Sequence, residues 1–352
     1  MKSLAAAIFS SLVFLADYYP ACAQEIFEEE PGLFATRQLR ATVPMGPPYK
    51  LVIQSALTLR GTINITATEQ SDVAVSYVKR SKAATKSKAI DFIDQIAVRL
   101  ERSVAGVRLQ LSAPNPAPWS EPDAGLVDAE VLVPKDCIIE VEAPYFDVAA
   151  EGPFETVVIP SSLGKLEIAD VTRQLKLETA NRSVSITRIS GEISVVTSNA
   201  DLVANEILSH GKQAQFRNDG GDIRIEGFVG ELNIKNNYGR IEVSDFDVEG
   251  SKNLIRGFSG PISVDIRRIT DGQVVITNGF EDVDITVPSD LSTRFSLAVD
   301  ENGKIEVGNF PFKTDLVQPD RLNLVTGDGE ALISASVTGE GNIFVHAFEE
   351  RD

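Results

Sequence analysis

Cysteine, histidine and tryptophan are scarce in this chain of 352 residues, which contains two cysteines, two histidines and one tryptophan. Cys22 lies in an N-terminal segment that we expect to be cleaved off, so Cys137 would remain alone. A single cysteine cannot form an internal disulfide, and we interpret Cys137 as a small apolar strand residue. No group of histidines and cysteines has the spacing of metal ligands, so we predict no metal site and no cofactor.

The shortage of histidine also argues against catalysis. His210 and His346 occupy unrelated places in the repeat described below, and one histidine among many serines and aspartates does not indicate a triad. A polysaccharide lyase or hydrolase, which is the enzyme alternative for this fold, would need grouped carboxylates in a loop-walled cleft. The turns of this chain are too short to build such a cleft easily. We therefore predict no catalytic residues and no enzymatic activity.

Positive charge is in deficit, because 33 lysines and arginines stand against 51 aspartates and glutamates and give a net charge of −18. This field repels polyanions, so nucleic acid is disfavoured as a partner. We interpret the acidic balance as a solvated surface. The segment Asn218–Asp222 (NDGGD) resembles a calcium turn but lacks EF-hand spacing, so an ordinary tight turn is the better interpretation.

Long apolar runs are absent beyond the N-terminus. There, Lys2 precedes the apolar run Leu4 to Ala16, and Ala21-Cys22-Ala23 follows as a cleavage site. This order is typical of a secretory signal, and the run is too short to span a bilayer. We expect export to the periplasm or the cell surface, with no integral membrane segment after cleavage. Acylation of Cys22, as in a lipoprotein, is the alternative, although Tyr19-Pro20 before it matches a lipobox poorly.

What the sequence does contain is a period. Pairs of apolar residues spaced two apart begin at Leu166, Leu175, Val184, Ile193 and Leu202, each 9 residues after the last. A spacing of two is typical of strands and excludes amphipathic helices. The remaining starts continue the series, with three steps lengthened to 12, at Ala214, Ile223, Leu232, Ile241, Asn253, Ile262, Val274 and Val283.

The strands alternate between two kinds. One kind carries a further apolar residue at its sixth position, and the other ends in small polar turns. Residues of the first kind are Val171, Ile189, Ile207, Phe228 and Phe246, and turn residues of the second are Asn181, Asn199, Gly220, Asn236, Asn278 and Gly279. The repeat is therefore about 18 residues, and the predicted fold is all-β: a parallel β-helix or β-solenoid with two strands per coil. An antiparallel sandwich is the rival, but the preserved register of 9 argues against it.

The rest of the chain is predicted to join the same stack. Strand-like alternation also occurs at residues 58–65, 107–111 and 333–345, whereas 114–122 is a proline-rich loop and the stretch around residues 90–100 is either a short helix or an irregular strand. The predicted sections are a signal peptide (1–23), a flexible leader (24–45), an N-terminal β-rich section (46–160), the regular repeats (161–287) and C-terminal strands with a tail (288–352).

These repeats resemble the bacterial putative-adhesin family of β-strand-repeat proteins, a domain family of unknown function. The segments that carry the resemblance are SGEISVVTSNADL (190–202), GGDIRIEGFVGELNIKNNYGRIEV (220–243), DGQVVITNGFEDVDITVP (271–288) and GEGNIFVHA (339–347). The likeness covers roughly residues 45 to 348. It implies a right-handed parallel β-helix at the cell envelope, and it carries over no site residues.

The three lengthened steps all follow the same kind of strand, so their turns should emerge on one side of the stack. Insertions on one face of a repeat protein often form its binding face, although drift in a tolerant turn would produce the same pattern. The candidate binding residues are His210, Lys212, Asp247, Glu249, Lys252, Arg267, Arg268 and Asp271. We predict an adhesin-like binding or scaffold protein whose partner is an envelope protein or a glycan; self-assembly through exposed end strands is the structural alternative.

Overall fold

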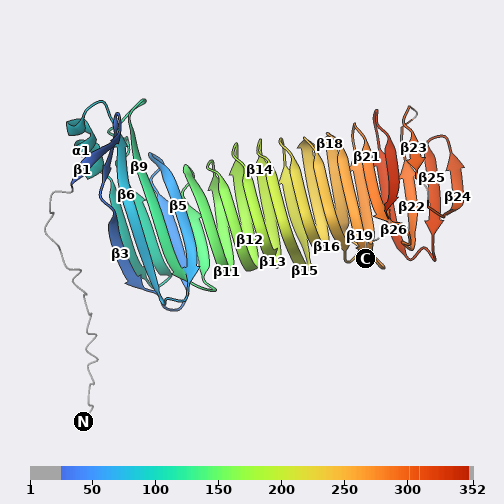
Figure 1. Cartoon of the computed structure of the whole chain (residues 1–352), viewed down its shortest axis with the longest axis horizontal. Coiled ribbons are helices and arrows are strands. Elements are labelled where there is room, and N and C mark those ends of the chain that lie inside the picture. Colours follow the sequence, from blue (N-terminus) through green and yellow to red (C-terminus); the bar gives the residue numbers. More distant parts are fainter. Residues whose placement is uncertain (1–24, 301, 309, 349–352) are drawn as a thin grey trace, which may run out of the picture.

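The computed structural model describes residues 25–300, 302–308 and 310–348. The predicted signal peptide, residues 1–23, lies outside the described residues. The described chain is all-β apart from one helix, and its strands stack side by side along the long axis of the molecule (Figure 1).

The middle of the chain consists of parallel strands that repeat with the predicted period. Leu166 pairs with Val184, which is 18 residues later, and Val184 pairs with Leu202. A second series begins at Leu175, which pairs with Ile193. The strands of this region are β10 (Ile138–Glu142), β11 (Phe146–Ser162), β12 (Leu166–Ala180), β13 (Val184–Ser190), β14 (Glu192–Ser198), β15 (Leu202–Asn218), β16 (Ile223–Tyr238), β17 (Ile241–Val248), β18 (Asn253–Ser259), β19 (Ile262–Ile269), β20 (Gln273–Asn278) and β21 (Val283–Pro288).

These pairings make two ladders of strands. The first ladder passes through Leu166, Val184, Leu202, Ile223, Ile241, Ile262 and Val283, and the second passes through Leu175, Ile193, Ala214, Leu232, Asn253 and Val274. All of these residues are buried. The inward side chains of both ladders form one continuous hydrophobic core, and Asn253 is the polar residue among those just named.

The sixth apolar position of the first kind of strand is also buried, which simple alternation would not allow. The residue before it has a positive φ that adds one residue to the strand and restores the inward direction. Asp170 (φ 59°), Arg188 (54°), Glu206 (57°) and Asp245 (51°) occupy this place. The buried residues that follow them are Val171, Ile189, Ile207 and Phe246.

Buried asparagines organise the turns that end the second ladder. The side-chain Nδ2 of Asn218 donates a hydrogen bond to the backbone oxygen of Ala200 (2.8 Å), and Asn236 donates to Gly221 (2.9 Å). Asn278 makes the same kind of contact further along the stack. Because the amide of Asn218 is committed to backbone groups in this way, the NDGGD segment behaves as a turn, as expected.

Both ends of the stack contain strands inserted out of sequence order. β26 lies between β20 and β22, and β27 lies between β21 and β23, all in parallel pairs. The antiparallel strands β24 and β25 then close the C-terminal end. The bounds are β22 (Thr293–Ala298), β23 (Ile305–Val307), β24 (Lys313–Gln318), β25 (Arg321–Thr326), β26 (Ala331–Val337) and β27 (Ile343–Phe348).

The N-terminal end has the same design. β4 lies between β8 and β10, and β5 lies between β9 and β11, although β8 and β9 come later in the chain. Antiparallel pairs of β6 with β9 and of β7 with β8 close this end. The bounds are β4 (Lys50–Ser55), β5 (Leu59–Thr68), β6 (Asp72–Lys82), β7 (Ala97–Ser103), β8 (Gly106–Ser112) and β9 (Ala124–Pro134).

The leader predicted for residues 24–45 is instead built into this end. It contains β1 (Ile26–Glu30), β2 (Leu33–Thr36) and β3 (Leu39–Pro44), and both β2 and β3 pair antiparallel with β6. The prediction of a loose segment was wrong because the leader has no repeat to reveal its partner. Covering β6 gives the end of the sheet a neighbour and leaves fewer unpaired backbone groups.

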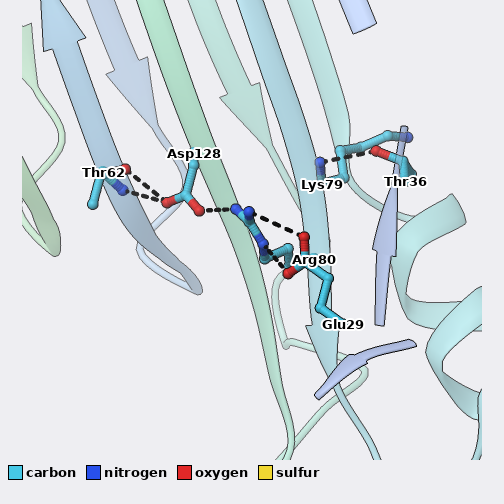
Figure 2. Close-up of polar contacts among 6 residues, drawn as sticks. All are labelled: Glu29, Thr36, Thr62, Lys79, Arg80 and Asp128. Atoms are coloured by element: carbon cyan, nitrogen blue, oxygen red, sulfur yellow. Dashed lines mark hydrogen bonds and ion pairs between the residues drawn. The ribbon is translucent and has the colours of Figure 1, made fainter. Parts of the chain in front are cut away.

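Polar contacts fix the leader in place (Figure 2). Arg80 of β6 reaches Glu29 of β1, with 2.7 Å between Nε and Oε2, and its other side reaches Asp128 of β9. The Asp128 carboxylate also accepts hydrogen bonds from the backbone nitrogen (3.0 Å) and hydroxyl (2.8 Å) of Thr62 in β5. One arginine therefore ties three strands of different sequence origin together.

The stretch around residues 90–100, for which a helix or an irregular strand was expected, contains the helix α1 (Lys86–Asp94). Thr85 caps its N-terminus by accepting a hydrogen bond from the Lys88 nitrogen (3.3 Å). Lys79 donates from its Nζ to the oxygen of Ile93 in the last turn of the helix (3.4 Å) and to the oxygen of Ile96 just past it (3.0 Å). Burial lowers the pKa of Lys79, and the nearby Asp94 opposes that shift.

Candidate functional site: two edges of the strand stack

The three lengthened turns lie along one edge of the stack, where strands of the first ladder lead into the second. We call residues 209–212, 249–252 and 270–272 the turn ridge. Hydrogen bonds donated by backbone nitrogens join neighbouring turns along this edge. They run from the Glu231 nitrogen to Ser209 Oγ (3.1 Å), from the Glu249 nitrogen to the Gly230 oxygen (3.1 Å), and from the Gln273 nitrogen to the Gly250 oxygen (3.2 Å).

A short turn separates the first long turn from the second, and it has no room for a side chain. Gly230 has a φ of 130°, and a Cβ built there would lie 1.8 Å from Ser209 Oγ. Only glycine fits such a position without displacing its neighbour. The close approach keeps the ridge continuous across the short turn.

Asp247 anchors the ridge electrostatically. Its side chain is only 6 % exposed, and its carboxylate oxygens lie 2.8 Å from Arg267 Nε and 2.5 Å from Arg267 Nη2. Arg268 Nη2 approaches the same carboxylate at 3.3 Å. A buried carboxylate needs such partners because desolvation disfavours the charged form. The structure thus brings three of the predicted site residues together, and Asp247 is a support rather than an exposed contact.

Asn253 is a second buried support of the ridge, and the sequence analysis did not single it out. It takes an inward position of the second ladder that is otherwise mostly apolar, and its Oδ1 accepts a hydrogen bond from the Leu232 nitrogen (2.8 Å). Its Nδ2 donates to the oxygens of Glu249 (3.1 Å), Gly250 (3.2 Å) and Gln273 (3.0 Å). One side chain therefore fixes the second long turn to the turns on both sides of it.

The remaining predicted residues are exposed on the ridge. Lys212 binds Glu192 at 3.0 Å, and this hydrogen bond lowers the pKa of Glu192. His210 is exposed in the first long turn and has a positive φ of 49°. Within the described part of the chain, no hydrogen-bond or ion-pair partner is found for the side chains of His210, Glu249, Lys252 or Asp271.

A second edge carries an aromatic ladder that the sequence analysis missed. Tyr238 ends β16, Phe258 lies next to the last residue of β18, and Phe280 follows the end of β20 by two residues. The three side chains are 58 %, 49 % and 46 % exposed. Their ring centroids are 6.3 Å and 5.3 Å apart, and both pairs are edge-to-face. The detectable signal was one aromatic residue at or just after the end of each of three successive strands.

Residues that could bind a metal ion or act as a nucleophile are sparse in the described ranges. No group of three or more histidine, cysteine, aspartate or glutamate residues among them is placed to hold a metal ion. Cys137 is buried, and this burial raises the pKa of its thiol to about 12. The part of the chain described here also contains no helix long and apolar enough to cross a membrane.

Comparisons with known proteins give the chain a family but little further detail. No match was found among curated proteins. Similar solved structures include a putative cell adhesion protein from Clostridium sporogenes (10 % identity, covering 89 % of this chain and 100 % of that one, TM-score 0.22). A putative adhesin (12 %, 88 % and 97 %, 0.28) and a putative lipid binding protein (9 %, 88 % and 96 %, 0.28), both from Parabacteroides distasonis, are also similar.

A family model covers most of the stack described above. It is that of the Toastrack DUF4097 domain, and it matches residues 50–293, which is more than half of the chain. The match spans the N-terminal inserted strands, the two ladders and the whole turn ridge. The chain therefore belongs to the Toastrack DUF4097 family.

Proposed function

We propose that this protein is an exported, non-catalytic binding or scaffold protein of the cell envelope, adhesin-like in its mode of action. Its fold in this proposal is a parallel β-solenoid with coils of about 18 residues and two strands per coil. The turn ridge is its recognition surface, and an envelope protein or glycan is its partner. The protein acts in the periplasm or at the cell surface.

The observation that carries this proposal is the contrast between supports and free side chains on the ridge. Asp247 and Asn253 are buried and hydrogen-bonded to several neighbours, so they hold the turns in fixed positions. His210, Glu249, Lys252 and Asp271 project from those turns into solvent. Rigid turns that present mixed charges lose little entropy on binding a polar partner.

The parallel pairing supports the solenoid itself. Partners in the first ladder are 18 residues apart where the turns are short, as in Leu166 with Val184. Both ladders contribute inward side chains to the same core. The long stack that results offers an extended surface of repeated turns, which is how repeat proteins commonly bind their partners.

The test is affinity capture from solubilised cell envelope, with residues 24–352 as the bait. A ridge variant carries His210→Ser, Glu249→Ser, Lys252→Ser and Asp271→Ser, which leaves Asp247 and Asn253 untouched. We expect the intact bait to capture a partner that the ridge variant does not. The captured partner must then bind the purified intact protein directly, because capture alone does not establish contact.

The matched control replaces four exposed polar residues away from the ridge, Glu167→Ser, Lys176→Ser, Arg182→Ser and Asp315→Ser. It removes two acidic and two basic groups and should retain the partner. Equal capture by the intact and ridge baits would contradict the proposal that the ridge is the recognition surface. Capture of no partner by any bait would contradict the binding function.

A further inference from the structure

Three basic residues form a row on the outer face of the second ladder. The ladder pairs Arg217 with Lys235 and Lys235 with Arg256, so the three residues occupy equivalent positions on neighbouring strands. All three side chains are exposed. Neighbouring strands are about 4.8 Å apart, so the row is about 10 Å long and runs along the stack. Val196 and Thr277, which are uncharged, continue the same position on either side.

This row is unusual for a chain with a net charge of −18. Like charges directly opposite each other on neighbouring strands destabilise a sheet. Elsewhere on this protein, stacked positions carry opposite charges, as in Arg188 with Asp170 and Arg224 with Glu242. Among the described residues, no carboxylate forms an ion pair with Arg217, Lys235 or Arg256.

The aromatic ladder of Tyr238, Phe258 and Phe280 adjoins this row. Phe258 follows Arg256 by two residues in β18, and Tyr238 follows Lys235 by three in β16. The aromatic rings are edge-to-face and about half exposed, so they do not belong to the buried core and can contact a ligand. Basic and aromatic side chains thus form two adjacent lines that both run along the stack.

We propose that these two lines are the binding site for a linear acidic polysaccharide that runs along the stack. Its carboxylates or sulfates pair with Arg217, Lys235 and Arg256, since charge-assisted hydrogen bonds to arginine are the strong ones. The apolar C–H faces of its sugar rings pack on Tyr238, Phe258 and Phe280. This inference rests on the proposed binding function and adds a substrate class and a second site to it.

Geometry favours a single polysaccharide chain over a membrane or a duplex. A bilayer or a DNA duplex presents negative charge over a broad surface and would meet the acidic field of the whole molecule. A single chain meets only the strip where the positive charges lie. The stacking of the basic row on neighbouring strands also suits a polymer with a regular repeat. Anionic vesicles and oligonucleotides serve as competing probes in the test.

The test is calorimetric titration of residues 24–352 with polygalacturonate and with dextran sulfate. The row variant carries Arg217→Gln, Lys235→Gln and Arg256→Gln. We expect it to weaken binding at least about tenfold and to flatten the dependence of affinity on salt, because fewer counterions are released. A ladder variant with Tyr238→Ser, Phe258→Ser and Phe280→Ser should weaken binding severalfold, and fully methyl-esterified polygalacturonate should bind weakly to the intact protein.

The charge-matched control carries Lys176→Gln, Arg182→Gln and Lys313→Gln, three exposed basic residues outside the row. It should bind like the intact protein, and circular dichroism should show all variants folded. An equal loss in the control would overturn the proposal, because attraction would then depend on net charge alone. Failure of the intact protein to bind either polymer would also overturn it.

Two further results are decisive. Row-dependent binding to oligothymidylate or to phosphatidylglycerol vesicles that is tighter than binding to both polysaccharides would overturn the assigned ligand class. If the ridge-dependent partner is still captured while no polysaccharide binds, this inference fails and the proposed function stands. If neither is observed, both fail.

Discussion

Asp247 shows at the residue scale how this protein fixes an exposed edge. Its carboxylate is buried, whereas its two arginine partners remain about half exposed or more. We expect Asp247→Ala to lower the free energy of unfolding by about 1–2 kcal/mol, since charge-assisted hydrogen bonds are lost while the arginines can still be hydrated. Urea denaturation measures the difference. Asp271→Ala, an exposed aspartate on the same ridge, should change stability by less than about 0.5 kcal/mol.

Asp265, unlike Asp247, should destabilise the folded protein at neutral pH. Burial raises its pKa, the nearby Asp245 raises it further, and Oδ1 has no hydrogen-bond partner among the described residues. The folded protein therefore holds this proton more tightly than the unfolded chain does, so ionised Asp265 destabilises the fold above its raised pKa. This destabilisation disappears as the pH falls through that value toward the ordinary aspartate pKa.

We expect Asp265→Asn to raise the urea midpoint at pH 7, because the amide has no charge to desolvate. Its advantage should shrink as the pH is lowered toward about 4, where the native carboxyl becomes protonated as well. Parallel denaturation curves of the native protein and the variant at pH 7, 5.5 and 4 measure this trend, with Asp271→Asn as the control. A variant less stable than the native protein at pH 7 would disprove the assignment.

At the scale of elements, the inserted strands β26 and β27 make the C-terminal end of the stack dependent on the last part of the chain. Each lies between two other strands, so Ile333, Ala335, Ile343 and Val345 are fully or almost fully buried. By contrast, β24 at the edge is mostly exposed. The inserted strands β26 and β27 should therefore contribute far more to stability than the edge strand β24.

Truncation after Glu330 should destabilise the protein far more than replacement of residues 313–318 by a glycine-serine linker. The truncation uncovers apolar faces of β20, β21, β22 and β23 at once, and exposed strand edges invite aggregation. Size-exclusion chromatography and urea denaturation distinguish the two variants. Similar, small losses in both would show that β26 and β27 are not inserted as the structure places them.

The sequence predicted the middle of the stack well because a period of 9 that alternates between two kinds of strand identifies both the buried face and the partner strand 18 residues away. Alternation alone identifies only the buried face. Thus Val107, Leu109 and Leu111 were predicted to alternate as a strand, but nothing in them indicates that Leu51 lies between Val107 and Ile139. The inserted ends and the built-in leader could not be predicted for the same reason.

The candidate site could likewise be predicted from the sequence only in part. Counting residues placed the lengthened turns on one edge, but it could not separate the buried Asp247 from the exposed Asp271. The aromatic ladder escaped because its members do not share one register position: strand partners here are 21 residues apart, whereas Tyr238, Phe258 and Phe280 are separated by 20 and 22 residues. Only pairing through the turns brings the three rings into line.

At the scale of the whole molecule, the stack separates a stable core from two edges that carry the exposed groups. The core runs continuously through both ladders, and the edges carry side chains that change from strand to strand. Changes on an edge should therefore alter recognition while leaving the fold intact, which is the property expected of a scaffold for binding.

Hydrogen–deuterium exchange of the protein with and without its captured envelope partner tests this account most directly. We predict slower exchange of backbone amides at residues 209–212, 249–252 and 270–272 when the partner is bound, with little change in the core strands. Protection confined to the end strands, or to the outer faces of the ladders away from these turns, would contradict recognition through the turn ridge.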